Sequence, residues 1–229
     1  MVRIKSVLKG FGIFSVLFII DMIIQSVYLL NNTKNSSFVD SIIIGIMMVA
    51  VEIVLVLPLY HGLSAKYDLF KVVKLKGEDF INTIIYVCTI LLGNALLILI
   101  HTSLIGKVTE AQNQESIESL ASPNMLVGLI VLVVFVAPIV EEMMFRGVIL
   151  TYLVNGMNKW IQIVVSGSLF GLFHILGNDW QWFAFIQYSF MGCVLAYACV
   201  KGQKLQYSIM AHMGNNLIAV MPLILLSFK

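Results

Sequence analysis

Long runs of apolar residues, separated by short polar segments, restrict what this sequence can fold into more than any other feature. Of its 229 residues, 60% are hydrophobic and only 11% are charged, and the mean hydropathy is +0.98. Soluble domains carry about 25% charged residues, and a helix needs about 20 apolar residues to cross a lipid bilayer. The runs have that length, so the sequence predicts an integral membrane protein with no residues left for a soluble domain.

The apolar runs predict an all-α fold, a polytopic transmembrane helix bundle of about seven spans. The first run follows basic residues, as in a signal peptide, but its length and Asp21 favour an uncleaved first helix. The segment 101–124 is expected to form the longest loop. We expect the seven spans at residues 10–30, 41–60, 80–100, 125–153, 160–176, 181–200 and 207–228.

The basic residues lie at the ends of the predicted spans and indicate the orientation of the bundle. With the N-terminus in the cytoplasm, the lysines of the loops that fall outside are only Lys34, Lys107 and Lys229. Cytoplasmic loops carry an excess of Lys and Arg, so we expect a multi-pass protein of the cell membrane with its N-terminus inside and its C-terminus outside. The net charge of +2 and the scattered basic residues argue against a nucleic-acid partner.

Ionisable side chains inside a span cost several kcal/mol unless they are paired, so each one is a candidate for function. Asp21 in the first span and Glu52 in the second are single carboxylates, which we expect to be structural. His61 and His101 lie at the ends of spans, where an imidazole reaches the water of the headgroup layer, and no chemistry is assigned to them. The other ionisable residues of interest gather in the fourth, fifth and seventh predicted spans.

The fourth predicted span carries three charged residues within two helical turns, Glu141, Glu142 and Arg146. Glu142 and Arg146 are four residues apart on one helix face, so we expect an ion pair that neutralises both side chains. Glu141 points about 100° away and lacks that partner, which suits a carboxylate that takes a proton from water. Pro138 removes one backbone hydrogen-bond donor just before the pair and is expected to bend the helix.

Two later spans each contain a histidine with a second notable residue four positions away. The fifth span has His174 four residues after Phe170, beside glycines that allow another helix to approach closely. The seventh span has His212 and Asn216, which therefore lie on one helix face. Together with Glu141, these residues provide a general base, two imidazoles and an amide donor, which can attack a peptide carbonyl with water.

The three motifs Glu-Glu-x-x-x-Arg, Phe-x-x-x-His and His-x-x-x-Asn, in this order on separate spans, resemble the CPBP family of intramembrane peptidases. This family groups the type II CAAX prenyl endopeptidases with bacterial bacteriocin-processing and self-immunity proteins. The resemblance covers residues 123–220, so we divide the chain into N-terminal transmembrane helices and loops, 1–122, and a CPBP-like catalytic helical core, 123–229. It implies four catalytic residues. Glu141 and His174 would activate the attacking water, and His212 and Asn216 would hold the oxyanion.

The resemblance implies a glutamate- and histidine-dependent intramembrane endopeptidase, and its partner would be a membrane-associated peptide substrate. Bacterial members of the family often act on small secreted peptides. The richness in Ile, Lys and Asn suggests a low-GC bacterium, where prenylated protein substrates are not expected. A bacteriocin or pheromone precursor is therefore the favoured substrate.

Several alternatives stay open at this point. No cofactor is assigned, because direct activation of water is favoured over a divalent metal such as zinc, which two histidines and a glutamate can also bind. Ser168 with His212 would give a serine mechanism. A non-catalytic membrane scaffold or immunity protein would keep the fold without the chemistry, and a proton-coupled transporter would use the same residues as a relay. The span boundaries also put Glu141 and His174 about 10 Å apart in depth, at 1.5 Å per residue.

Overall fold

The computed structural model describes residues 2–32, 36–106, 122–176 and 181–227, and in these residues the regular structure is entirely helical. A composite helix runs from residue 123 to residue 153, between α3 and α7. The predicted all-α fold is confirmed. The long single helices are α1 (Val2–Asn31), α2 (Phe38–Ser64), α3 (Gly77–Ile105), α7 (Lys159–Ile175), α8 (Trp182–Gly202) and α9 (Leu205–Ser227).

With the composite helix, these make seven long helices among the described residues. All of them except α7, six in number, are long and apolar enough to cross a membrane. α7 has 17 residues, and at 1.5 Å per residue it is about 25 Å long, somewhat less than a hydrocarbon layer of about 30 Å. Large hydrophobic side chains are exposed along the rods, while charged residues are found in the interior, the reverse of a soluble protein. The protein is a multi-pass membrane protein, and its described residues contain six helices of spanning length and one shorter apolar helix.

The composite helix is continuous, but its hydrogen-bond pattern changes along its length. Two of its parts are π-helical, so the N–H of Ala137 bonds to the carbonyl of Leu132, five residues back. Pro138 has no N–H, which leaves the carbonyl five residues before it, Val133, without a donor from the helix. Wide turns thus lie on both sides of Pro138, and the bend expected there stays a prediction. The five parts are η2 (Pro123–Met125), α5 (Leu126–Ile130), η3 (Val131–Val136), α6 (Ala137–Glu142) and η4 (Met143–Leu153), of which η3 and η4 are π-helical.

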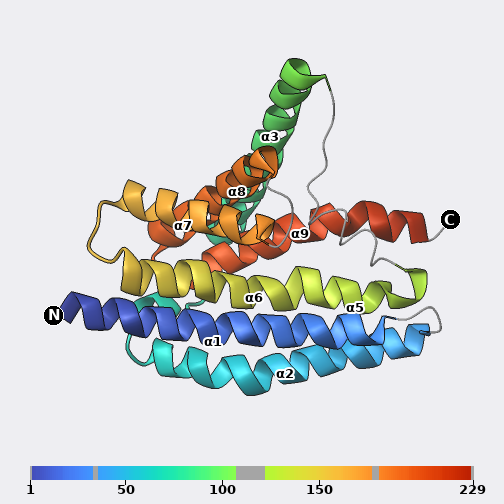
Figure 1. Ribbon diagram of the computed structural model, residues 1–229, viewed down its shortest axis with the longest axis horizontal. Coiled ribbons are helices and arrows are strands. Elements are labelled where there is room, and N and C mark those ends of the chain that lie inside the picture. Colours follow the sequence, from blue (N-terminus) through green and yellow to red (C-terminus); the bar gives the residue numbers. More distant parts are fainter. Residues whose placement is uncertain (1, 33–35, 107–121, 177–180, 228–229) are drawn as a thin grey trace.

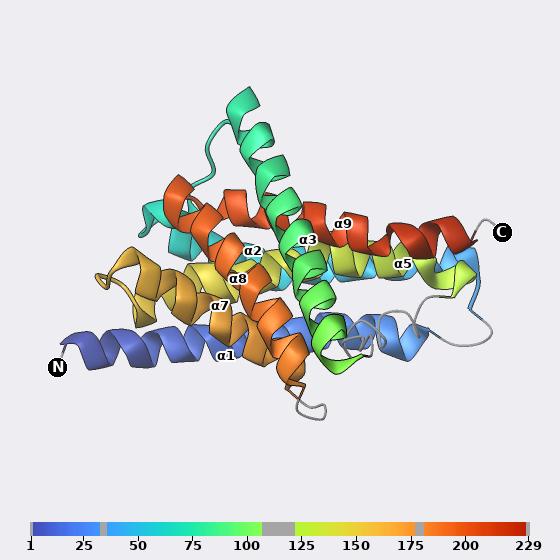
Figure 2. The same ribbon diagram turned by 90° about the horizontal axis from the view of Figure 1, so that it is seen from above.

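Three long rods, α1, α2 and the composite helix, run side by side along the longest axis of the molecule (Figures 1 and 2). α9 runs alongside the composite helix in the opposite direction, and α3 and α8 cross these rods at a steep angle in both views. α7 and α8 pack against each other as a tight hairpin. This arrangement brings α1, α7 and α9 around α6 and η4, in the middle of the bundle.

Glycines explain how closely α7 and α8 approach each other. A Cβ atom on Gly167 would lie 2.6 Å from the backbone nitrogen of Cys193, and one on Gly192 would lie 2.8 Å from the Cα atom of Gly167. A side chain at either position would push the helices apart, so the two backbones are in direct contact. The close approach expected from the glycines of the fifth predicted span is present.

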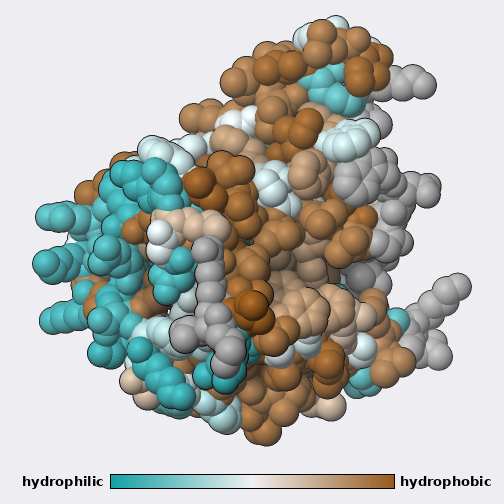
Figure 3. Space-filling view, turned by 60° about the vertical axis from the view of Figure 1, so that its left-hand side comes forward, coloured by the Kyte–Doolittle hydropathy of each residue, from teal (hydrophilic) through white to brown (hydrophobic). Residues whose placement is uncertain are grey.

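The polar connections gather at one end of the molecule. Figure 3, in which the N-terminal side of Figure 1 is turned forward, shows hydrophilic side chains at this end and hydrophobic side chains over much of the remaining surface. The connection from α2 to α3 contains the short helix η1 (Asp68–Phe70), and Lys204 donates to the carbonyl of Asp68 over 2.7 Å. This bond ties the start of α9 to the connection. α3 extends into the predicted loop 101–124, of which residues 107–121 lie outside the described residues.

Candidate active site

A buried ion pair lies at the centre of the candidate site. The guanidinium of Arg146, on η4, is 2.7 Å from Oε1 of Glu142, on α6, and neither side chain is exposed. Another nitrogen of Arg146 donates to the carbonyl of Gly192 over 2.9 Å, and the guanidinium lies 4.5 Å from the centre of the Phe170 ring. The i,i+4 spacing thus gives the expected contact, and a carbonyl and an aromatic face further stabilise the guanidinium.

The same oxygen of Glu142 also holds His212, on α9. Nδ1 of His212 lies 2.9 Å from Oε1 of Glu142, and because a carboxylate accepts hydrogen bonds, the ring donates through Nδ1. Nε2 then faces Glu141, at 3.7 Å from Oε2. The ion pair therefore orients this imidazole in addition to neutralising charge. Both ring nitrogens face carboxylates, so the serine mechanism with His212 gains no support from its contacts.

His174 is held in a similar way on another side of Glu141. Its Nδ1 donates to the carbonyl of Phe170, one turn earlier on α7, over 3.0 Å. Its ring stacks on that of Tyr188, on α8, with 4.5 Å between the ring centres. Nε2 of His174 is 3.8 Å from Oε2 of Glu141. Oε2 of Glu141 is therefore close to the Nε2 atoms of two imidazoles.

The difference of about 10 Å in depth expected between Glu141 and His174 is wrong, because their side chains meet. That expectation gave every span a similar position in the bilayer. α7 is shorter than the composite helix and follows it directly through the turn at residues 154–158. Counted from this turn, both residues are roughly four helical turns away, so they reach the same level.

Asn216 lies one turn beyond His212 on α9 and bonds to the composite helix. Its Nδ2 donates over 2.9 Å to the carbonyl of Val133, which Pro138 leaves without a donor. The amide of Asn215 donates to Oδ1 of Asn216 over 3.2 Å. One of the two Nδ2 hydrogens of Asn216 therefore fastens α9 to η3, and the amide group retains a second one.

The site has an inner and an outer layer. Glu142 exposes none of its side chain and His212 exposes 3%, whereas Glu141 exposes 10% and His174 exposes 11%. Oε2 of Glu141 is buried and has no hydrogen-bond partner among the described residues. A buried acceptor without a donor is costly, so the outer layer is a place where a donor molecule would bind favourably.

An apolar groove with a volume of about 580 Å³ approaches this outer layer between α1, η4 and α7. Phe145 and Phe173 line the groove, and the ring of Phe173 lies 5.5 Å from that of His174. Phe18, on α1, packs edge-on against Phe173 at 5.9 Å. Aromatic rings are therefore what separates the groove from the imidazole.

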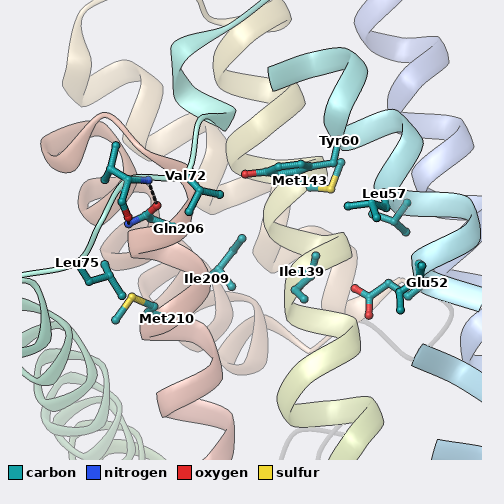
Figure 4. Close-up of a pocket in the computed structure, with 13 residues that line it drawn as sticks. Glu52, Leu57, Tyr60, Val72, Leu75, Ile139, Met143, Gln206, Ile209 and Met210 are labelled. Atoms are coloured by element: carbon teal, nitrogen blue, oxygen red, sulfur yellow. Dashed lines mark hydrogen bonds between the residues drawn. The ribbon is translucent and has the colours of Figure 1, made fainter. Parts of the chain in front are cut away.

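A second groove, of about 440 Å³, lies between α2 and α9 and has α6 at its base (Figure 4). Figure 4 shows Glu52 extending into it from α2, and Oε1 of Glu52 is buried without a hydrogen-bond partner among the described residues. Near the other end, the side chain of Gln206 bonds to both the N–H and the carbonyl of Val73. None of the four predicted catalytic residues lines either groove, and the first groove is the one that reaches a site imidazole through its lining residue Phe173.

Asp21, expected to be structural, is buried in the bundle. It is on α1, which packs against α6 and η4, and is 1% exposed. Its Oδ2 accepts a hydrogen bond from Gln25 over 2.8 Å, and its Oδ1 is buried without a partner among the described residues. Sequence reasoning marked Asp21 as an intramembrane carboxylate, but hydropathy gives no signal for which distant helix faces it.

The side chains around Glu141 also bear on the question of a metal. Within the residues that the structure describes, no group of three or more His, Cys, Asp or Glu side chains is arranged to hold one metal ion. Nδ1 of His212 is engaged with Glu142, and Nδ1 of His174 with a carbonyl.

The fold and these contacts define a class, a multi-pass helical membrane protein with a carboxylate and two imidazoles held between its helices. The chain belongs to the CPBP family of intramembrane peptidases. Its residues 123–218 match the family model described as type II CAAX prenyl endopeptidase Rce1-like. The match includes all four predicted catalytic residues. Membership of the family indicates a membrane protease.

A protein of Mycoplasma capricolum subsp. capricolum, described as uncharacterized, is similar to nearly the whole chain. The two are 30% identical over 232 residues, which is 95% of this chain and 67% of that protein. The chain therefore spans two thirds of the length of this relative. The similarity extends through α1, α2 and α3, which the family model does not cover. No solved structure matches the chain.

Proposed function

We propose that the protein is a glutamate- and histidine-dependent intramembrane endopeptidase that hydrolyses a peptide bond in a membrane-associated peptide. The observation that carries the proposal is the position of Glu141, whose Oε2 lies within 3.8 Å of Nε2 of both His174 and His212. Carboxylates and imidazoles are well suited to moving protons near neutral pH. Membership of a peptidase family supports the same reaction.

Glu141 and His174 activate the attacking water in this mechanism. Because Nδ1 of His174 donates to a carbonyl, Nε2 of the neutral ring carries the lone pair. Its distance of 3.8 Å from Oε2 of Glu141 is longer than a direct hydrogen bond and suits a water that donates one hydrogen to each atom. Glu141 takes a proton from this water as the water oxygen attacks the carbonyl carbon. It then passes the proton to the departing amine.

His212 and Asn216 stabilise the negative oxygen that forms on the substrate carbonyl. His212 presents Nε2 to this oxygen, since its Nδ1 is held by Glu142. Asn216 donates through the Nδ2 hydrogen that is not bonded to Val133. A donor of this kind contributes about 10²- to 10³-fold to the rate of acyl transfer.

The substrate is a hydrophobic peptide that enters from the lipid, such as a bacteriocin or pheromone precursor. The apolar groove between α1, η4 and α7 has room for its side chains, at about 580 Å³, next to His174. The protein lies in the cell membrane with its N-terminus and its basic connections in the cytoplasm, as the distribution of lysines favours. The mechanism needs no metal.

Cleavage of synthetic peptides by the purified protein tests the proposal. Wild type, Glu141→Gln and His174→Ala are incubated in detergent with a panel of hydrophobic peptides, and products are identified by mass spectrometry. Products that form only with wild type, while all three proteins remain folded by circular dichroism, support a peptidase. Equal cleavage by wild type and Glu141→Gln contradicts it, as does proton-driven uptake of a peptide into vesicles without any cleaved product. A chelator of divalent cations, added to the same reaction, distinguishes direct activation of water from a metal mechanism.

A further inference from the structure

The groove between α2 and α9 has the depth of one leaflet of a bilayer. Along α2 its lining runs from Glu52 to Tyr60, about 12 Å at 1.5 Å per residue, and Tyr60 lies one turn before the end of the helix at Ser64. One leaflet, half of a hydrocarbon layer of about 30 Å, is about 15 Å deep. A peptide that crosses the whole bilayer would extend well past the groove. The groove therefore fits a chain that enters from one side and ends near the middle of the membrane.

The walls of this groove are apolar, and its rim is exposed where lipid surrounds the bundle. Ile53, on α2, is 54% exposed, and Val72, in the connection to α3, is 72% exposed. The polar residues in the lining are Glu52, Tyr60 and Gln206 (Figure 4). A water-soluble ligand would find few polar partners on such walls, whereas a hydrocarbon chain needs none.

Hydrogen bonds fix the wall at the outer end of the groove. The hydroxyl of Tyr60, on α2, donates to the carbonyl of Phe70 in the connection. The side chain of Gln206, on α9, accepts from the N–H of Val73 over 2.8 Å and donates to its carbonyl over 3.1 Å. The connection is thus held to both helices, so the outer end is a built part of the groove.

Lysines stand at this outer end, between the residues that line it. The segment 71–76 reads Lys-Val-Val-Lys-Leu-Lys, and its three apolar residues line the groove while its three lysines are exposed. Lys71 is paired with Asp68 at 2.7 Å. Lys74 and Lys76 form no ion pair with a carboxylate among the described residues. Two ammonium groups are therefore available directly beside an apolar groove.

The acidic residues nearby do not cancel this positive charge. Asp68 is already paired, and Oδ2 of Asp79 accepts from the backbone N–H of Lys76 over 2.7 Å at the start of α3. Glu78 is exposed beside it. Residues 66–79 together with Lys204, which bonds to the carbonyl of Asp68, carry five lysines against three acidic residues. An anionic group is therefore attracted to this end of the groove.

We propose that the groove between α2 and α9 is a binding site for an anionic phospholipid, with one acyl chain in the groove and the phosphate at Lys74 and Lys76. Basic residues at the ends of spans attract anionic headgroups, and the groove adds contacts for the chain. The carboxyl of Glu52 marks the inner end, where the chain stops. Ile139 and Met143 form the base of the groove, so the lipid packs against the helix that carries Glu141. The site does not depend on the peptidase function.

Native mass spectrometry of the purified protein in detergent measures binding of dioleoyl phosphatidylglycerol and of dioleoyl phosphatidylcholine, which have the same chains. We expect wild type to prefer phosphatidylglycerol. The exposed lysines can be changed without loss of the fold, and Lys74→Gln/Lys76→Gln should lower its affinity for phosphatidylglycerol about 25-fold, at about fivefold for each lysine. Its affinity for phosphatidylcholine should change less than about twofold.

Lys159→Gln/Lys201→Gln is the matched control, because it removes two lysines at the ends of α7 and α8 that do not adjoin the groove. It should change the affinity for phosphatidylglycerol by less than about twofold. Equal losses in the two double variants would overturn the proposal, since they would indicate general attraction to a basic surface.

The role of the groove is tested by filling it. Ile53→Phe should lower the affinity for phosphatidylglycerol at least about tenfold, whereas Ser15→Phe, in the other groove, should leave it unchanged. Bound phosphatidylglycerol should also raise the thermal unfolding temperature of wild type and of Ser15→Phe, and not that of Ile53→Phe. Binding that Ile53→Phe does not weaken would overturn the proposal. Displacement of the lipid by inorganic phosphate at constant ionic strength, or by a hydrophobic peptide, would do the same.

Discussion

The polar residues inside this bundle fall into two regions that differ in how well they are partnered. Between α6, η4 and α9, the side chains of Glu142, Arg146 and His212 each have a partner of opposite or complementary charge within 2.9 Å and expose at most 3%, although Oε2 of Glu142 and Nε of Arg146 have no hydrogen-bond partner among the described residues. Glu52, in the groove between α2 and α9, has an oxygen without a partner among the described residues, and no Lys, Arg or His lines that groove. A single carboxyl inside a span is weak evidence for chemistry, whereas groups held in place from several helices are strong evidence.

The helices that carry these two regions also differ in how much of each is buried inside the bundle. In the most apolar 18-residue stretch of each helix, the share buried inside the bundle is 44% for the composite helix, 22% for α2 and 11% for α3. A side chain on the composite helix can therefore be fixed by neighbours on several sides. This is why the residues with converging contacts lie on and around that helix.

The largest expected effect is on catalysis, where Glu141 is compared with Glu52. Glu141→Gln keeps the size of the side chain and removes the base, so the cleavage rate should fall by about 10²- to 10⁴-fold, as for other positioned acid–base groups. Glu52→Gln should leave the rate within about twofold of wild type. Product formation is followed by mass spectrometry. Similar losses in the two variants would erase the distinction between the two regions.

The next effect is on stability and concerns the ion pair. Arg146→Met leaves Glu142 buried without its partner, which should cost about 3–5 kcal/mol. The double variant Glu142→Gln/Arg146→Met should recover a large part of this loss, because no charge then remains unpaired. Thermal unfolding in detergent measures both. A double variant as unstable as the single one would mean that the pair acts through packing and not through charge.

A smaller loss of stability is expected where α7 meets α8. Gly167→Ala places a Cβ atom 2.6 Å from the backbone nitrogen of Cys193, so the hairpin must open, at a cost of about 1–3 kcal/mol. Gly62→Ala is the control, since nothing lies within 4 Å of a Cβ atom there. It should be neutral or slightly stabilising, because alanine favours the helix. The same thermal unfolding measurement applies, and equal losses at both positions would contradict the role of close packing.

The smallest expected effect compares the two grooves. Ser15 lines the groove beside the site, and Ser15→Phe should fill part of it and raise KM for hydrophobic peptides by about three- to tenfold, with kcat little changed. Ile53→Phe narrows the other groove in the same manner and should not affect KM. Steady-state kinetics over a range of peptide concentrations distinguish the two. An effect of Ile53→Phe alone would move the substrate path to the side of α2.

The fold could be predicted from the sequence because its determinants are local. The length and polarity of each apolar run fix helical spans in a bilayer, and those runs are visible without a structure. The ends of the helices were less accessible. α2 continues to Ser64 and α3 to Ile105, beyond the predicted 60 and 100, because a helix does not end where its apolar residues do.

The site could be predicted only in part, for the same reason. The contact between Glu142 and Arg146 follows from i,i+4 spacing on one helix. The contact of Glu142 with His212 and the burial of Asp21 depend on how distant helices pack, which no spacing encodes. The catalytic roles of the four motif residues stay predictions.

The wide turns of η3 make the number of residues in this helix matter, and not only their identity. A π turn accommodates one residue more than the regular helix would hold over the same distance. Deleting one residue within Val131–Val136 would rotate everything before it by about 100° relative to everything after it. Either α5 would turn away from α2, or Glu141 would turn away from the imidazoles. Insertions and deletions in this short stretch should therefore be far less tolerated than changes of side chain.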